Sequence, residues 1–410
     1  MMLNNEKKTP LWASSDRGGK TEQKNAPLGE LLFFLAFFLF CLKYTLDYSN
    51  IIPMRPEVLN SLCVALSITC SGIKIFMQRY TPLRFALTMA VCLIMGYSSL
   101  ISTNYAFLLG FLLIVAMQDI DFAKVVRFGF FFKIISLAVH VSWYIFIFNT
   151  NPAVIRFNFR GATGVGMPRH NFFMGHSNNF MAFLIWACME YIYMRYDKLN
   201  IFHMAVIWAL NIIFFMFTDS QTAILVLILV TFFILADKLG KGFFDKLLSS
   251  VAKYSYTFIS LFFLFLIVIY PETSGRAREI WDDFDWFLSG RIWYGAYAYY
   301  VYGLTFLGIP DMQPQKVFWE NRWNDTLTIF DNYYIGNLVS YGFVNTILTV
   351  IVFIAFCGKM ENREKIIIIA FTFYGIMESY VTNVVICFAL FIIGKYLYEA
   401  KPIKSAGKSL

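Results

Sequence analysis

The stretch AILVLILVTFFILA, residues 223–236, holds one threonine and otherwise only apolar side chains. A helix needs about 20 predominantly apolar residues to cross the hydrocarbon core of a bilayer, and this run with its flanks reaches that length. The runs LLFFLAFFLFCLKYTL (31–46) and TFISLFFLFLIVIY (257–270) repeat the pattern. The sequence therefore predicts an all-α polytopic membrane protein.

Composition supports this fold class. Of the 410 residues, 59% are hydrophobic and 15% are charged, and the mean hydropathy is +0.60. Soluble domains hold roughly 25% charged residues. About twelve membrane-spanning helices are expected, near residues 29–46, 57–77, 83–101, 104–118, 128–148, 175–194, 200–217, 220–236, 256–271, 335–356, 364–380 and 383–399.

The distribution of charge predicts the orientation. Residues 29–400 form one membrane domain, and the polar segments 1–28 and 401–410 are expected to be cytoplasmic tails. With that placement 23 Lys and Arg residues lie in inner segments and nine in outer ones, as the positive-inside rule requires. The net charge of +8 is thus explained by topology, and no nucleic-acid partner is expected. The polar N-terminus and the long first apolar run predict that no signal peptide is cleaved.

The seven cysteines all lie in expected spans or at their cytoplasmic ends, away from any oxidising outer loop. They are expected to be small apolar residues without disulfide bonds.

Polar sequence on the outer side is concentrated in two segments, 149–174 and 272–334. Loops longer than about 12–15 residues usually have a function of their own or are disordered. The tryptophans of the second segment favour order, and its Trp- and Tyr-rich residues 291–303 predict a short helix in the membrane interface. The two segments carry seven arginines: Arg156, Arg160, Arg169, Arg276, Arg278, Arg291 and Arg322. Because the planar guanidinium suits phosphate and carboxylate, they suggest an outer pocket for an anionic ligand.

Several motifs resemble those of bacterial Wzy-type polysaccharide repeat-unit polymerases, which are related to the O-antigen ligases. The resemblance rests on SGRIWYGAYAYYVYGLTFLGIP (289–310) and FDNYYIGNLVSYGFVNTIL (330–348), with RGATGVGMPRHNFFMGHSNNF (160–180), TDSQTAIL (218–225) and GIMESYVTNVVICF (375–388) in the expected order. It covers roughly residues 150–400. Two departures stand out: Gln221 replaces the family's arginine, and Asp331 replaces the histidine of the ligases, which favours a polymerase.

The resemblance implies a GT-C-like fold with a partly helical outer loop, in the bacterial plasma membrane. It also implies an inverting, metal-independent glycosyltransferase without a cofactor. The enzyme would transfer a growing glycan from polyprenyl pyrophosphate onto the next lipid-linked repeat unit. Its partners would be the lipid-linked donor and acceptor, membrane lipids, a chain-length regulator and a flippase.

Three groups of residues are candidates for this chemistry. The catalytic candidates are Asp331 and His176 as bases and Arg291. The residues expected to bind pyrophosphate, where fixed cations would stabilise the leaving group, are Arg156, Arg160, Arg169 and Arg291. Those expected to bind or orient sugars are Asn178, Asn179, His170, Asn332, Tyr333 and Glu378.

Simpler roles remain open for several of these residues. Asp331 could cap a helix, His176 could hydrogen-bond a neighbouring helix, and Glu378 could pair with another span. The motif WDDFDW (281–286) offers Asp283 and Asp285 for a divalent cation, but a solvated acidic turn beside Arg276 and Arg278 is simpler, so no metal is expected. The alternative functions are an O-antigen-type ligase and a lipid-linked oligosaccharide flippase, although no two halves of the chain match as transporter repeats do.

Overall fold

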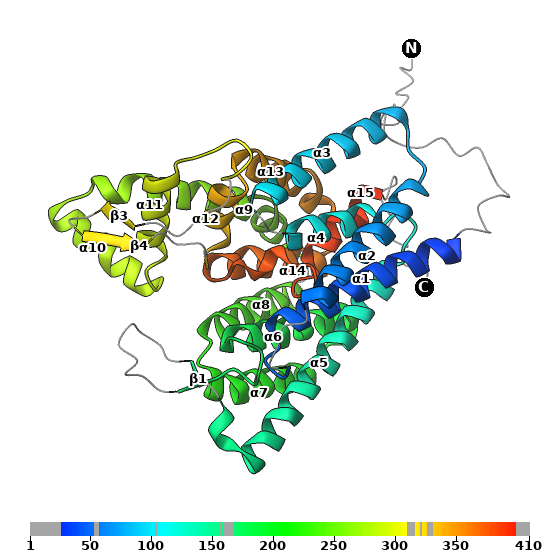
Figure 1. The fold of residues 1–410 in the computed structure, drawn as a ribbon, viewed down its shortest axis with the longest axis horizontal. Helices are drawn as coiled ribbons and strands as arrows, with labels where there is room; N and C mark the ends of the chain where they lie inside the picture. The colour runs from blue at the N-terminus through cyan, green and yellow to red at the C-terminus, as the bar shows by residue number, and fades with distance from the viewer. Residues whose placement is uncertain are drawn as a thin grey trace.

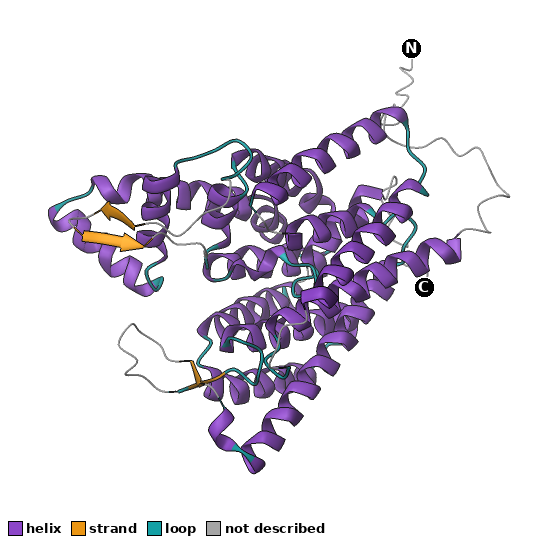
Figure 2. Cartoon of the chain, in the orientation of Figure 1, coloured by secondary structure: helices purple, strands orange, loops and turns teal. Residues whose placement is uncertain are grey.

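The computed structural model describes residues 26–52, 57–102, 105–155, 157–158, 168–240, 242–309, 316–319, 322–325 and 331–398. These residues form an all-α polytopic membrane protein, with two short β-hairpins as the only strands among them (Figure 2).

The described helices follow the apolar runs of the sequence. They are α1 (Ala26–Tyr48), α2 (Glu57–Phe76), α3 (Pro82–Ile101), α4 (Tyr105–Val115), α5 (Phe122–Thr150), α6 (Ser177–Arg195), α7 (Ile201–Thr218), α8 (Gln221–Leu239), α9 (Asp245–Ile269), α10 (Gly275–Phe287), α11 (Arg291–Tyr302), α12 (Tyr333–Ser340), α13 (Phe343–Phe356), α14 (Asn362–Met377) and α15 (Ala389–Tyr398). The hairpins pair β1 (Phe157–Asn158) with β2 (Arg169–His170), and β3 (Lys316–Trp319) with β4 (Arg322–Asp325), both antiparallel.

Seven helices within the described residues are long and apolar enough to cross a membrane: α1, α2, α3, α5, α7, α8 and α9. They coincide with seven of the twelve predicted spans. The other five predicted spans are also helical, but α4, α14 and α15 are shorter, α6 is more polar, and the predicted span 335–356 is divided into α12 and α13. All seven cysteines are free thiols, and six of them are buried.

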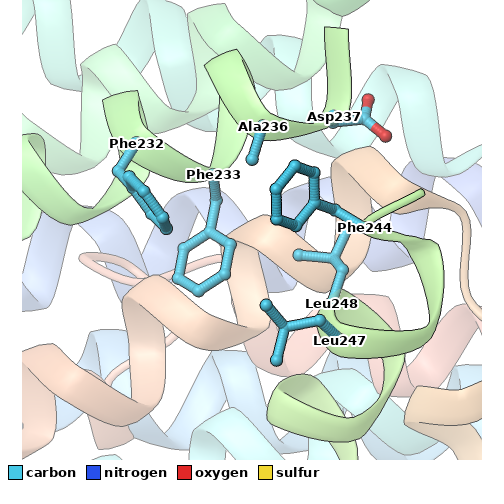
Figure 3. A pocket seen from close by; sticks show the side chains of 7 residues that line it. All are labelled: Phe232, Phe233, Ala236, Asp237, Phe244, Leu247 and Leu248. Carbon is cyan, nitrogen blue, oxygen red and sulfur yellow. The ribbon is translucent and has the colours of Figure 1, made fainter. Parts of the chain in front are cut away.

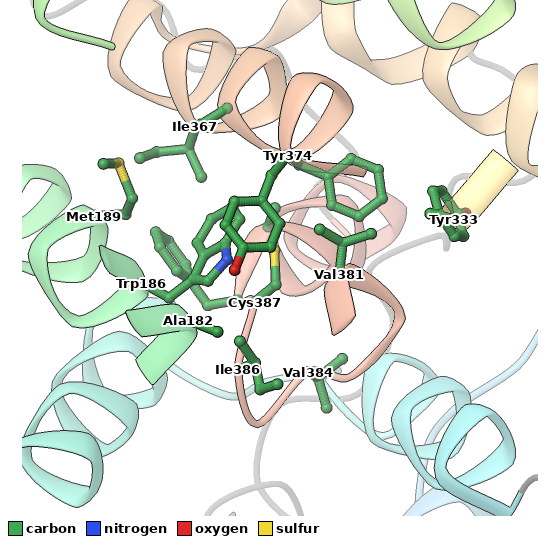
Figure 4. Packing of buried hydrophobic residues seen from close by; sticks show 14 of the residues in the cluster. Ala182, Trp186, Met189, Tyr333, Ile367, Tyr374, Val381, Val384, Ile386 and Cys387 are labelled. Atoms are coloured by element: carbon green, nitrogen blue, oxygen red, sulfur yellow. The ribbon is translucent and has the colours of Figure 1, made fainter. Parts of the chain in front are cut away.

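Helices α6 and α14 form the centre of the bundle. Most side chains of both helices are buried, and α14 packs against α6, α8, α9 and α12. In Figure 4, Trp186 of α6 meets Tyr374 of α14, with ring centroids 5.8 Å apart. Because most of their surface faces protein, these helices can carry polar groups that a lipid-facing span would not tolerate.

The predicted span 335–356 is interrupted at Gly342, whose φ is +83°. The chain at 305–308 inserts into this break, where the carbonyls of Thr305 and Phe306 accept the N–H groups of Phe343 and Val344 at 3.0 and 3.1 Å. A Cβ atom at Gly342 would lie 2.5 Å from the carbonyl oxygen of Phe306, so the insertion requires glycine. The break is buried in protein, which satisfies backbone groups that lipid could not.

The predicted outer loop is partly helical, as expected, and projects from one end of the bundle (Figure 1). Helix α11 coincides with the helix predicted over 291–303, and its small residues let it approach α9 and α12 closely. A Cβ at Gly295 would lie 2.5 Å from Ile335 and 2.8 Å from Ile267. The residues predicted to form an acidic turn, 281–286, belong instead to helix α10. The buried Asp285 of this helix serves as a cap for α11.

That cap is a pair of hydrogen bonds. The Asp285 carboxylate accepts the backbone N–H groups of Ile292 and Trp293 at 2.6 and 3.2 Å, while its side chain is buried. Asp282, one turn away, pairs with Arg278 at 2.9 Å. The turn between α10 and α11 uses positive φ angles at Ser289 and Gly290. Together these contacts fix the position of Arg291, the first residue of α11.

Candidate functional site

A strained turn leads from β2 to α6. Phe172, Phe173 and Gly175 all have positive φ angles, which is rare for non-glycine residues and concentrates at functional sites. The Asn171 side chain holds the turn, accepting from the N–H of Phe173 at 3.0 Å and donating to the carbonyl of Gly175 at 3.3 Å. A Cβ at Gly175 would lie 3.1 Å from the carbonyl oxygen of Tyr48 at the end of α1. The turn is therefore packed tightly against α1 and delivers His176 to the start of α6.

Arg169 lies at the base of this turn and is buried. Its guanidinium donates to the carbonyls of Thr218 and Asp219 at 2.7 and 3.2 Å, at the end of α7. A cation is favourable there because the last carbonyls of a helix carry partial negative charge. Asp219 has a φ of +47°, so the chain leaves α7 sharply toward Ser220 and α8.

Asn178 connects Arg169 to Glu378. Its side-chain oxygen accepts from Arg169 at 2.7 Å, and its amide donates to Glu378 Oε1 at 2.7 Å. Thr222 of α8 also donates to Glu378 Oε1, at 3.5 Å. Glu378 directly follows α14, and only 1% of it is exposed. A buried carboxyl group is thus held by side chains of two segments, α6 and α8, that are far from it in the sequence.

Arg291 reaches the same corner from α11. Its Nε and one terminal nitrogen donate to the carbonyl of Met377, the residue before Glu378, at 3.1 and 2.6 Å. The other terminal nitrogen donates to the carbonyl of Leu288 at 2.8 Å. A guanidinium has five N–H donors, and the bonds to described residues use three of those of Arg291. The two outer segments that were singled out in the sequence therefore meet around Glu378.

Asp331 is the accessible acid of the site. Its carboxylate lies 3.7 Å from the Arg291 guanidinium, and 63% of its side chain is exposed. The adjacent Asn332 is buried, caps α12 by accepting from the N–H of Ile335 at 2.9 Å, and donates to the carbonyl of Ile376 at 2.8 Å. The cap of this helix is thus Asn332 and not Asp331, which leaves the carboxylate of Asp331 open to solvent.

His176 immediately precedes α6 and acts as its N-cap. Its Nδ1 accepts the backbone N–H of Asn178 at 3.2 Å. Burial lowers the pKa of His176 below its usual value, the nearby Arg169 lowers it further, and Asp331 opposes both effects. A neutral imidazole is consistent with the observed hydrogen bond, because only an unprotonated Nδ1 can accept.

The structure places three other candidates away from this corner. His170 contacts Tyr144 of α5 through Nδ1 at 2.5 Å, and burial lowers its pKa. Asn179 is buried and donates to the carbonyl of Met174 at 3.0 Å. Tyr333 is buried against α9, with its hydroxyl 3.3 Å from that of Tyr256. Arg156 and Arg160 lie outside the described residues.

Sequence reasoning missed three contributors: Asp285, Thr222 and the carbonyl of Met377. The motif 281–286 drew attention to Asp285 only as a metal ligand, and its role as a cap depends on the turn that brings α11 back to it. Thr222 stands next to Gln221, where the resemblance had drawn attention to a missing arginine. Nothing in the sequence marks a backbone carbonyl as a ligand.

An apolar pocket of about 450 Å³ opens beside this corner, between α8, α9, α10 and α14. Three of its lining residues, Thr222, Leu288 and Met377, also contact Glu378 or Arg291. Apart from Ser255, the rest of its wall is made of apolar side chains such as Leu225, Phe262 and Phe284. The arrangement suits a ligand with an anionic head and a long hydrocarbon chain.

The opposite end of α8 holds a much smaller pocket of about 10 Å³, where Phe233, Phe244 and Leu248 face one another beneath Asp237 (Figure 3). That volume fits no ligand larger than a water molecule. Among the described residues no group of three or more His, Cys, Asp or Glu side chains is placed to hold a metal ion. Asp283 and Asp285 do not form a shared site, since Asp285 is committed to α11.

The chain matches no known family, no curated protein and no solved structure.

Proposed function

We propose that the protein is a polysaccharide polymerase that transfers a glycan from polyprenyl pyrophosphate onto a lipid-linked repeat unit. Transfer would occur at the outer face of a bacterial plasma membrane, with both termini in the cytoplasm. The proposal rests on one observation: Arg169 and Arg291, from separate segments, converge around Glu378 beside an exposed carboxylate and an apolar pocket.

In this proposal the diphosphate of the donor binds Arg291 and Arg169, and the isoprenoid chain enters the pocket between α8, α9, α10 and α14. Breaking the bond between the sugar and the phosphate leaves negative charge on the diphosphate. Fixed guanidinium groups in a site of low dielectric stabilise that charge strongly. Their own hydrogen bonds to backbone carbonyls hold both guanidinium groups in place before the substrate binds.

Asp331 is proposed as the general base. It takes the proton from the acceptor hydroxyl as the hydroxyl oxygen attacks the anomeric carbon, and polyprenyl pyrophosphate leaves. The proton then passes from Asp331 to solvent, which its exposure allows. Neutral His176 lies within electrostatic reach of Asp331 and is the second candidate for this role.

The decisive experiment compares Arg291→Ala and Arg169→Ala with Arg276→Ala, which removes an exposed arginine of α10. In cells that make the polymer, the first two variants should leave single repeat units on the lipid carrier at the outer surface. The control should make polymer of normal length. The same separation should hold for purified proteins given a labelled lipid-linked repeat unit.

Two other outcomes would replace the proposal. Repeat units that accumulate on the cytoplasmic side would indicate a flippase, for which the buried Lys133–Glu190 ion pair between α5 and α6 is the favouring observation. Full-length polymer that stays on its carrier would indicate a ligase, which shares the donor chemistry but uses another acceptor.

A further inference from the structure

A second apolar groove lies between α1 and α5, at the end of the bundle away from Glu378. It has a volume of about 490 Å³. Its apolar wall consists of Phe34, Phe38, Phe128, Phe131, Phe132 and Ile135. Phe131 and Ile135 are 55% and 62% exposed, so the groove opens toward the surroundings of the bundle. Two of these rings, Phe34 of α1 and Phe128 of α5, join the two helices, with their centroids 5.6 Å apart.

The mouth of this groove carries two cations. Lys124 bridges from α5 to Glu30 of α1 at 2.6 Å, with side chains 51% and 37% exposed. Asp121 is engaged with the start of α5, where it accepts the N–H of Ala123 at 2.9 Å. Arg127 lies one turn further along α5, is exposed, and has no ion-pair or hydrogen-bond partner in the described part of the chain. Within the described residues, Glu30 and Asp121 are thus engaged elsewhere, and no carboxylate pairs with Arg127.

The groove is separate from the candidate active site. Tyr48, at the far end of α1, touches the turn that delivers His176, whereas Glu30 and Phe34 lie in the first turns of the same helix. At 1.5 Å per residue the 18 residues from Glu30 to Tyr48 span about 27 Å, close to the hydrocarbon thickness of a bilayer. The mouth thus lies at the headgroup level of the leaflet opposite the site.

We propose that this groove binds an anionic phospholipid of that leaflet. One acyl chain lies along the phenylalanines, and the phosphodiester accepts hydrogen bonds from Arg127 and Lys124. A planar guanidinium suits phosphate oxygens, and basic residues at the membrane surface attract anionic lipids. The volume falls in the range of small-molecule sites, about 300–1,000 Å³. The phenylalanine side chains favour binding of an acyl chain, and the two cations favour a negatively charged headgroup.

The test is lipid retention by the full-length protein, purified in detergent and mixed with phosphatidylglycerol or phosphatidylcholine. Intact-complex mass spectrometry would count the bound lipids. Wild type should keep phosphatidylglycerol at least several-fold better than phosphatidylcholine. Arg127→Gln should lose most of that preference. Arg195→Gln, an exposed arginine on α6, should keep it.

Three results would overturn the inference: equal retention of the two lipids by wild type, unchanged preference in Arg127→Gln, or full competition by glycerophosphoglycerol, which has the head but no chains. If Arg127→Gln does not fold, Ile135→Trp, which fills the groove from its lipid-facing side, replaces it. That variant should also lose the preference, and normal retention would again overturn the inference.

Discussion

Asn178 and Glu378 are 200 positions apart in the sequence, yet the Asn178 amide donates to the Glu378 carboxyl at 2.7 Å. Because the same asparagine accepts from Arg169, this bond ties the arginine of one outer segment to the corner that holds the other, Arg291. The two arginines are thus held near each other by one connected set of hydrogen bonds and not by two independent contacts.

The first prediction concerns that network. Asn178→Ala and Glu378→Gln should each lower activity and stability. The double variant should lose less stability than the two single variants lose together, and the difference, the coupling energy, should be about 0.5–3 kcal/mol. Thermal unfolding and polymerisation rates of all four proteins would measure it. Strict additivity would show that the two residues act independently.

Asp331→Asn is expected to lower the turnover rate roughly 10²–10⁴-fold, the usual contribution of a general base. Binding of the lipid-linked donor should change little, because Asn keeps the size of the side chain and Arg291 remains. Asp283→Asn, an exposed acid on α10, is the matched control. A variant that polymerises at the wild-type rate would remove Asp331 from the mechanism and leave His176 as the base.

His176 gives a prediction about pH. Its pKa is lowered in the folded protein from the usual 6.5, so the unfolded chain takes up a proton first as the pH falls. The contribution of His176 to the free energy of unfolding is therefore fully present above pH 6.5. It is lost as the pH falls from 6.5 toward the lower pKa that His176 has in the folded protein. His176→Asn keeps an N-cap side chain but does not titrate. Between pH 7 and 5, the Tm of wild type should fall relative to that of the variant, and parallel curves would contradict the assignment.

The cap of α11 is testable through Asp285. Asp285→Ala removes the acceptor for two N–H groups and should cost about 1–2 kcal/mol of stability. It should also reduce activity, because Arg291 begins the helix that loses its cap. Asp285→Asn, which retains an acceptor oxygen, should recover part of both, and Asp283→Ala should change neither. If Asp285→Ala destabilised the protein without affecting polymerisation, the position of Arg291 would not depend on this cap.

The elements that local sequence determines were predicted well. Hydropathy adds up along a single segment, so the runs at 31–46 and 223–236 identified their helices, and the Trp- and Tyr-rich stretch identified α11. The break at Gly342 was not predictable, because it depends on the chain at 305–308 fitting into it. The same holds for the bond between Asn178 and Glu378. Contacts between residues that are far apart in the sequence produce no repeating pattern, so they cannot be recognised in a single sequence.

Glu190 illustrates a different limit. It stands inside the apolar sequence of α6, and Lys133 stands inside that of α5, so each reads as an isolated charge in its own segment. The structure pairs them at 2.6 Å, with side-chain exposures of 1% and 0%. A Cβ at Gly129 would lie 2.6 Å from the same carboxylate, so only glycine leaves room for the pair. Burial alone would make each charge costly, and their pairing, which could not be read from either segment alone, offsets that cost.

This pair leads to the last prediction. Lys133→Met strands a buried carboxylate and should cost about 3–5 kcal/mol, whereas Lys133→Met combined with Glu190→Met should be close to neutral. Lys124→Met, which breaks the exposed pair with Glu30, should cost no more than about 1 kcal/mol. Thermal unfolding in detergent would rank the three variants.

The double variant also distinguishes a polymerase from a flippase. If the ion pair is only structural, cells carrying the double variant make normal polymer, since the site at Glu378 is intact. Repeat units stranded on the cytoplasmic side in those cells would instead mean that the charges serve transport, and the polymerase proposal would have to give way to a flippase.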